Sequence, residues 1–398
     1  MASAPPQLTT RQLAFRLSPM FIVSWTRTYS VVLPGVIATF GLTHSQAGLF
    51  VGIIESGSFA SLLLLGLVIE RLGGVRVLAI SLPMVACALL LMTSIKSFLW
   101  LIPVMLLLGT GLAWTANSVN ILMASMGERR AFYLGILHTT FSAFSVIAPL
   151  AAGLIVSWGS WQLFYRLIAV VAILLTILVW RLQHTSQSSP PNPMPAKRSS
   201  PNPQAKTAWQ SIRVILTVCF GAFALAGVQG TLNTWSYLYV EDRFHVAHET
   251  ATLAPAAFWI GILLGRFALT LLSQHFSARS LLLFSSLVPG MALQLMPLCS
   301  AYGLAMVLLF MAGLGVSGTY QLGTSWAAER IPTRTGIAST AIMAFAWLGI
   351  GIWPWTTGIL IDHYSFDTLP HIAFAGSILA ASAFFLTRRT RITTPNTP

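Results

Sequence analysis

The sequence predicts an all-α membrane protein with twelve transmembrane helices in two pseudo-symmetric six-helix bundles. Composition, the number of apolar runs and likenesses between the two halves lead to this prediction. Of the 398 residues, 56% are hydrophobic and only 8% are charged, whereas a soluble domain carries roughly 25% charged residues. With a mean hydropathy of +0.77, the composition excludes a water-soluble fold and the collagen, coiled-coil and disordered classes.

The apolar runs are long enough to cross a bilayer, which takes about 20 residues per helix. The first half contains six such runs, at 17–41, 45–69, 76–95, 98–126, 131–157 and 161–181. The second half contains six more, at 212–240, 250–273, 280–299, 302–327, 335–361 and 368–387. Residues 182–211 between them are rich in Pro, Ser and Asn, which predicts a flexible linker. We therefore expect an N-terminal bundle at 1–181, a cytoplasmic linker at 182–211 and a C-terminal bundle at 212–398.

The basic residues predict the orientation of the chain. The sequence has 22 Lys and Arg against 9 Asp and Glu, a net charge of +13. When the N-terminus is placed in the cytoplasm, alternating spans put most of the basic residues on the cytoplasmic side. Such a bias is typical of cytoplasmic loops, so we expect a bacterial inner-membrane protein with both termini inside. The bias also explains the charge without a nucleic-acid partner.

The two halves resemble each other near the ends of predicted spans four and ten. The dipeptide Glu128-Arg129 is followed 201 residues later by Glu329-Arg330. Asn120 in predicted span four has Gln321 in predicted span ten at the same offset. Parallel repeats of this kind are a known architecture among membrane transporters. The offsets therefore favour two repeated bundles over a single continuous one.

The loop between predicted spans two and three carries a recognisable motif. Residues 66–76 read GLVIERLGGVR. This resembles the signature of the major facilitator superfamily, in which Gly is followed after three residues by Asp-Arg, a further Gly and basic residues, with Glu70 here replacing the Asp. The resemblance implies a role in gating at the cytoplasmic face for Gly66, Glu70, Arg71, Gly73 and Arg76. A simple tight turn anchored by positive charges is the alternative interpretation.

Predicted spans seven and eight resemble a narrower branch of that family. The pattern Trp235 to Tyr239, with Phe258-Trp259 further on, is similar to the fucose–proton symporters. Those symporters carry membrane-buried acids on spans one and four. Here predicted span one has Arg27 instead, and predicted span four has asparagines.

Two ionisable residues lie deep within the predicted spans. Glu55 and Arg27 are each about ten residues from the start of their span, so both lie near mid-membrane. Because a charge at that depth costs about 2.5–3.5 kcal/mol, it marks function by default, and we expect the two side chains to pair. We interpret Glu55 as a proton-coupling acid assisted by Arg27, or Arg27 as the cation for an anionic solute. A fixed structural ion pair is the alternative. His138 in predicted span five is a further candidate for proton relay, or a packing residue.

Neutral polar side chains mark the predicted solute-binding surface. On predicted span seven, Gln229, Asn233 and Tyr237 recur every four residues and so share a helical face. The resemblance implies that spans one, four, seven and ten line a central cavity. Hydrogen bonding between helices is the alternative role. The predicted substrate contacts are Trp114, Asn117, Asn120, Gln229, Asn233, Trp235, Tyr237, Tyr320 and Gln321.

These features favour a secondary transporter over an enzyme, a channel or a receptor. The sequence contains no HExxH, GxSxG or GxxxxGK[ST] motif, so we expect no catalysis, no metal and no cofactor. Alternating-access, proton-coupled uptake of a small polar or anionic solute by a monomer in the lipid bilayer is the favoured function. Proton-driven efflux of a drug or siderophore-like compound is the alternative. The stretch from Ala148-Pro149 to Gly153 resembles a degraded antiporter motif and keeps efflux open.

Overall fold

The structure is a computed structural model that describes residues 9–126, 129–185, 205–330 and 335–386, and every long element among them is a helix. The helices of the first half are α1 (Thr10–Leu17), α2 (Pro19–Thr26), α3 (Tyr29–Phe40), α4 (His44–Leu72), α5 (Gly74–Met92), α6 (Phe98–Ala124), α7 (Arg130–Trp158) and α8 (Trp161–Thr185). Those of the second half are α9 (Ala205–Phe244), α10 (His248–Ala251), α11 (Leu253–Leu272), α12 (Ala278–Leu295), α13 (Tyr302–Val316), α14 (Thr319–Arg330), α15 (Thr335–His363) and α16 (Thr368–Leu386).

The helices are suited to a membrane in length and composition. Of the described residues, ten helical segments are long and apolar enough to cross a bilayer. An eleventh arises if Thr10–Thr26 and Tyr29–Phe40, which meet at a 47° bend, form one broken span. Helix α4 is 29 residues long and covers predicted span two, but it is not among those ten. The all-α, multi-span fold is thus confirmed, while the count of twelve spans stays a prediction.

The chain divides into two compact units by its internal contacts. Unit 1 comprises Met1–Met194 and Ser236–Ala256, and unit 2 comprises Pro195–Trp235 and Ala257–Pro398. The end of α9 and the short α10 belong to unit 1, where α10 packs on α7. Most of the predicted linker, residues 186–204, lies outside the described residues, and its two ends continue α8 and α9 as helix. The bundle boundaries at 181 and 212 stay predictions.

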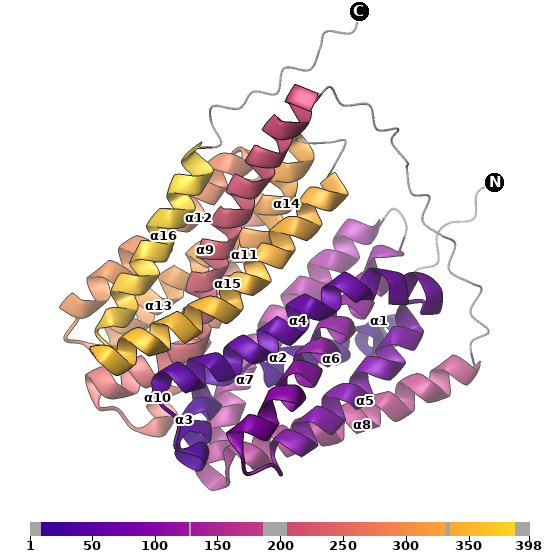
Figure 1. Cartoon of the computed structure of the whole chain (residues 1–398), viewed down its shortest axis with the longest axis horizontal. Coiled ribbons are helices and arrows are strands. Elements are labelled where there is room, and N and C mark those ends of the chain that lie inside the picture. The colour runs from indigo at the N-terminus through magenta and orange to yellow at the C-terminus, as the bar shows by residue number, and fades with distance from the viewer. Residues whose placement is uncertain (1–8, 127–128, 186–204, 331–334, 387–398) are drawn as a thin grey trace, which may run out of the picture. The chain divides into compact units, whose positions relative to one another are not determined.

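Glycines set the closest helix crossing in unit 1, where α4 packs on α6 (Figure 1). A Cβ atom added to Gly109 would meet the backbone carbonyl of Ile54, and one added to Gly57 would meet that of Leu106. Small residues are enriched at membrane helix interfaces because they let backbones approach. These two glycines therefore hold α4 and α6 in direct backbone contact.

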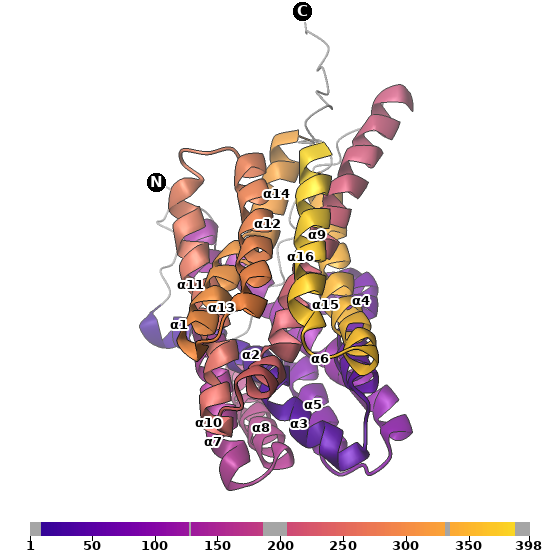
Figure 2. The same cartoon turned by 90° about the vertical axis from the view of Figure 1, so that its left-hand side faces the viewer.

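Unit 2 repeats this crossing between α11 and α13, which lie side by side in Figure 2. A Cβ on Gly313 would meet the carbonyl of Phe258, and one on Gly261 would meet that of Phe310. All four residues follow their unit 1 counterparts by 204 positions. The two units therefore share a packing scheme that the sequence pattern alone did not reveal.

The offset of 204 differs from the 201 found in the sequence at the ends of spans four and ten. The difference of three residues falls between Gly315 and Gln321 in unit 2, against Gly111 and Asn120 in unit 1. Helix α6 runs through this stretch without interruption, whereas unit 2 changes there from α13 to α14. The shorter stretch of unit 2 thus coincides with a helix break.

Candidate functional site

The helix pair that corresponds to predicted span one is broken where its charged residue lies. Helix α2 ends at Thr26 and α3 begins at Tyr29, with Arg27 and Thr28 between them. The Thr28 amide donates to the Trp25 carbonyl at 3.2 Å. A break inside a membrane is tolerated where neighbouring groups satisfy the freed backbone atoms. One such group is a side-chain hydroxyl on α8.

A tyrosine on α8 supports the break. The hydroxyl of Tyr165, which is fully buried, donates to the carbonyl of Thr26 at 3.4 Å. That carbonyl would otherwise lack a helical partner at the end of α2. The broken conformation is therefore supported within unit 1, and the side chains of Arg27 and Tyr29 reach α4.

The predicted pairing of Arg27 with Glu55 is present. Arg27 Nε donates to Glu55 Oε1 at 3.0 Å and Nη2 donates to Oε2 at 3.2 Å. Glu55 is 1% exposed and Arg27 is 8% exposed. Two parallel charge-assisted bonds of this kind are stronger and more directional than a neutral hydrogen bond. The pair therefore has a fixed geometry in the interior of unit 1.

Two neutral hydroxyls complete this cluster, and neither was predicted. Tyr29 donates to Glu55 Oε1 at 2.9 Å. Ser58 accepts from Arg27 Nη2 at 3.1 Å and donates to the Gly109 carbonyl at 2.9 Å. The spacing could have indicated Ser58, which lies three residues after Glu55 and so shares its helical face. The cluster thus ties the broken span to α4 and α6.

Unit 2 holds a neutral hydrogen bond at the corresponding positions. The indole Nε1 of Trp259 on α11 donates to Oδ1 of Asn233 on α9 at 2.8 Å. These residues follow Glu55 and Tyr29 by 204 positions, the offset of the glycine crossings. Arg27 corresponds to Thr231, whose hydroxyl shares a hydrogen bond with Thr357 at 3.3 Å. The positions of Arg27 and Glu55 are therefore charged in unit 1, whereas the equivalent positions in unit 2 hold neutral residues.

The other predicted contacts on α9 fall into different surroundings. Gln229 is half-buried, one turn before Asn233. Trp235 is fully buried, and its Nε1 donates to the Pro354 carbonyl at 3.0 Å. That bond favours a packing role for Trp235 within unit 2. Gln229 and Asn233 are half-buried, and their contact with a solute stays a prediction.

Tyr237 belongs to a separate polar cluster in unit 1. Its buried hydroxyl donates to Glu241 Oε1 at 2.7 Å and lies 2.6 Å from His248 Nδ1. The buried Nε2 of His248 has no hydrogen-bond partner among the described residues. Glu241 was missed although it lies one helical turn after Tyr237. Within the described ranges, His, Cys, Asp and Glu form no group of three able to hold a metal ion.

The remaining predicted residues lie half-buried on three helices. On α6, Asn117 Nδ2 donates to the Ala113 carbonyl at 2.8 Å, one turn earlier. The half-buried residues of this group are Trp114, Asn117 and Asn120 on α6, His138 on α7, and Tyr320 and Gln321 on α14.

The predicted gating loop is a tight turn between α4 and α5. Gly73 ends α4 with φ 78°, a conformation that favours glycine, and its N–H donates to the Ile69 carbonyl at 2.8 Å. Gly66 lies inside α4. The charged members are exposed, namely Glu70, Arg71 and Arg76. The turn is thus present, and its gating role stays a prediction.

Known structures resemble this fold over nearly its whole length. A bacterial homologue of the human lysosomal transporter Spinster, inward-facing and occupied, has a TM-score of 0.74 at 17% identity and covers 96% of this chain and 98% of its own. The nucleoside transporter NupG has 0.76 at 12% identity, covering 96% and 100%. FucP in the outward conformation has 0.66 at 17% identity, covering 95% and 99%.

Sequence comparison identifies the family. Bypass of stop codon protein 6 of Saccharomyces cerevisiae is 19% identical over 192 residues, which cover 42% of this chain and only 38% of the yeast protein. A family model described as Major Facilitator Superfamily matches residues 19–354 and also 218–398. The resemblance drawn from the loop at residues 66–76 is therefore confirmed. Since this match covers most of the chain, the chain belongs to the Major Facilitator Superfamily.

Proposed function

We propose that this chain is a secondary active transporter that takes up a small polar or anionic solute by alternating access, driven by protons. It works as a monomer in the bacterial inner membrane, with both termini in the cytoplasm. The buried cluster of Glu55, Arg27 and Tyr29 is the observation that carries this proposal. A carboxyl group that gains and loses a proton within the membrane is the simplest device for coupling.

The pairing suggests how a proton and a solute could be coupled. When Glu55 is ionised, its two carboxylate oxygens accept hydrogen bonds from Nε and Nη2 of Arg27. A proton on the Glu55 carboxyl removes the negative charge and weakens that pairing. The guanidinium then needs another anionic partner, since a buried cation without one is costly. An anionic solute takes this place, so proton and solute are carried together, and Tyr29 keeps the Glu55 side chain in position.

Neutral polar groups would recognise the rest of the solute. Gln229 and Asn233 are half-buried on one face of α9, and Trp259 fixes the Asn233 amide through its carbonyl oxygen. We assign substrate contact to these residues first. Trp114, Asn117, Asn120, Tyr320 and Gln321 are further contacts in this proposal; Trp235 and Tyr237 have weaker support, and His138 stays a candidate proton relay.

Transport in proteoliposomes tests this function. The purified protein would be screened with labelled sugars, nucleosides and carboxylates, nucleosides being included because NupG is a nucleoside transporter. We expect at least one solute to accumulate against its gradient when the vesicle exterior is acidic. A protonophore should abolish that accumulation. Accumulation that survives the protonophore would contradict proton coupling.

Proton-driven efflux is the second candidate, favoured by the packing of α7. Pro149 lies within this helix, and Gly153 leaves room for Thr252 at the start of the neighbouring segment. The same vesicles distinguish the two directions. An exporter inserted inside-out would accumulate a drug-like compound in exchange for protons when the vesicle interior is acidic. Uptake of polar metabolites under that gradient would be absent.

A further inference from the structure

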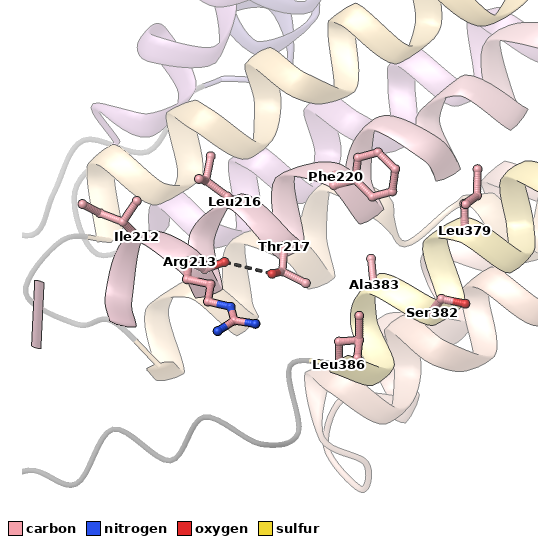
Figure 3. A pocket seen from close by; sticks show the side chains of 9 residues that line it. All are labelled: Ile212, Arg213, Leu216, Thr217, Phe220, Leu379, Ser382, Ala383 and Leu386. Carbon is pink, nitrogen blue, oxygen red and sulfur yellow. Dashed lines mark hydrogen bonds between the residues drawn. The ribbon is translucent and has the colours of Figure 1, made fainter. Parts of the chain in front are cut away.

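A hollow opens on unit 2 between residues 212–220 of α9 and the last turns of α16, with a volume of about 520 Å³ (Figure 3). Its walls are mainly apolar, with Leu216 and Phe220 from α9 and Leu379 and Leu386 from α16. These side chains are between 43% and 64% exposed. Since the helices lie in a membrane, an apolar hollow on their exposed surface is filled by lipid rather than water.

One end of this hollow is positively charged. Arg213 lines it, and Figure 3 shows its side chain directed into the space between the two helices. At the same end of unit 2, Arg279 on α12 donates to the carbonyls of Phe384 and Phe385 in the last turn of α16. The sequence has no Asp or Glu at 205–240 or at 368–398. The hollow therefore offers a guanidinium with no acidic residue in the stretches of α9 and α16 that line it, since the acids of α9, Glu241 and Asp242, lie at its far end.

We propose that this hollow binds one anionic phospholipid from the leaflet at that end of the helices. Its phosphate would pair with Arg213, and one acyl chain would lie along Leu216 and Phe220. Arg213 and Phe220 are seven residues apart, about 10 Å along the helix axis, so the hollow takes the upper part of a chain. Basic pockets between membrane helices recognise anionic headgroups in this way.

Lipid binding by the purified, full-length protein tests this site. Native mass spectrometry in detergent would compare phosphatidylglycerol with phosphatidylcholine. We expect tighter retention of phosphatidylglycerol, and Arg213→Gln should weaken it about fivefold, the loss of one arginine near a lipid headgroup. Arg213→Lys keeps the charge and should stay within twofold of the wild type. Arg181→Gln, at an exposed arginine on α8, is the matched control and should change nothing.

A second variant tests the apolar part of the hollow. Leu216→Trp fills the space without disturbing buried contacts, since Leu216 is 52% exposed. It should reduce retention of both lipids. Equal binding of the two lipids by the wild type, or equal losses for Arg213→Gln and Arg181→Gln, would overturn the proposal. A dimer in detergent that Leu216→Trp dissociates would also overturn it, because a second copy would then be the occupant.

Discussion

The two units use the same helix crossing but place different chemistry beside it. In unit 1, Tyr29 and Glu55 form a hydrogen bond of 2.9 Å within an ionic cluster. In unit 2, the residues 204 positions later, Asn233 and Trp259, form a neutral hydrogen bond of 2.8 Å. Both pairs join the unit's first long span to its second.

The comparison indicates whether the ion pair of unit 1 is required for helix packing. Unit 2 reaches the same crossing with neutral residues, Thr231 and Trp259, in place of Arg27 and Glu55, so packing does not require the ion pair in unit 1. Replacing a buried ion pair by well-packed neutral groups is often neutral or even stabilising. The cost of keeping Glu55 and Arg27 in the membrane therefore favours a role in transport.

Removing one member of the ion pair should have the largest effect on stability. Arg27→Gln leaves the Glu55 carboxylate buried without its cation, which costs about 3–5 kcal/mol. Thermal unfolding in detergent would show a strong loss of stability. The double variant Arg27→Gln with Glu55→Gln should recover most of it. If the double variant were as unstable as the single one, the fold of unit 1 would depend on the charges after all.

The shared crossing predicts equal sensitivity in the two units. Gly109→Ala and Gly313→Ala each press a methyl group on a backbone carbonyl, and overpacking of this kind costs about 1–3 kcal/mol. Gly135→Ala is the matched control, because nothing lies within 4 Å of its added Cβ. Unequal losses at Gly109 and Gly313, measured by the same unfolding assay, would break the equivalence of the units.

An effect no larger than this is expected at the neutral pair of unit 2. Asn233→Leu removes the acceptor of the buried Trp259 indole N–H, and an unsatisfied buried donor costs about 1–3 kcal/mol. Solute binding should weaken more than stability if Asn233 contacts the solute. Trp259→Phe breaks the same hydrogen bond but keeps the Asn233 amide, so it should lose stability similarly and retain more binding. If both variants lost solute binding equally, Asn233 would act through helix packing and not through contact with the solute.

Much of the fold could be predicted because membrane spans depend on composition over about 20 residues. The contact of Arg27 with Glu55 could be predicted for a similar reason, since two opposite charges at one depth have few other partners. The break at Thr28 could not, because no Pro or Gly lies at it and the hydroxyl that bonds the freed Thr26 carbonyl comes from Tyr165 on α8. The bond from Trp259 to Asn233 depends on how α9 and α11 face each other, which the spacing along either helix does not determine.

Proton coupling in this protein rests on Glu55, and one substitution tests that role most directly. Glu55→Gln keeps the shape of the side chain and removes its titratable group. With a solute found in the proteoliposome screen, we predict that this variant exchanges labelled solute for unlabelled solute but no longer accumulates it under a pH gradient. If the variant still concentrated the solute with the same pH dependence as the wild type, Glu55 would not carry the coupling proton.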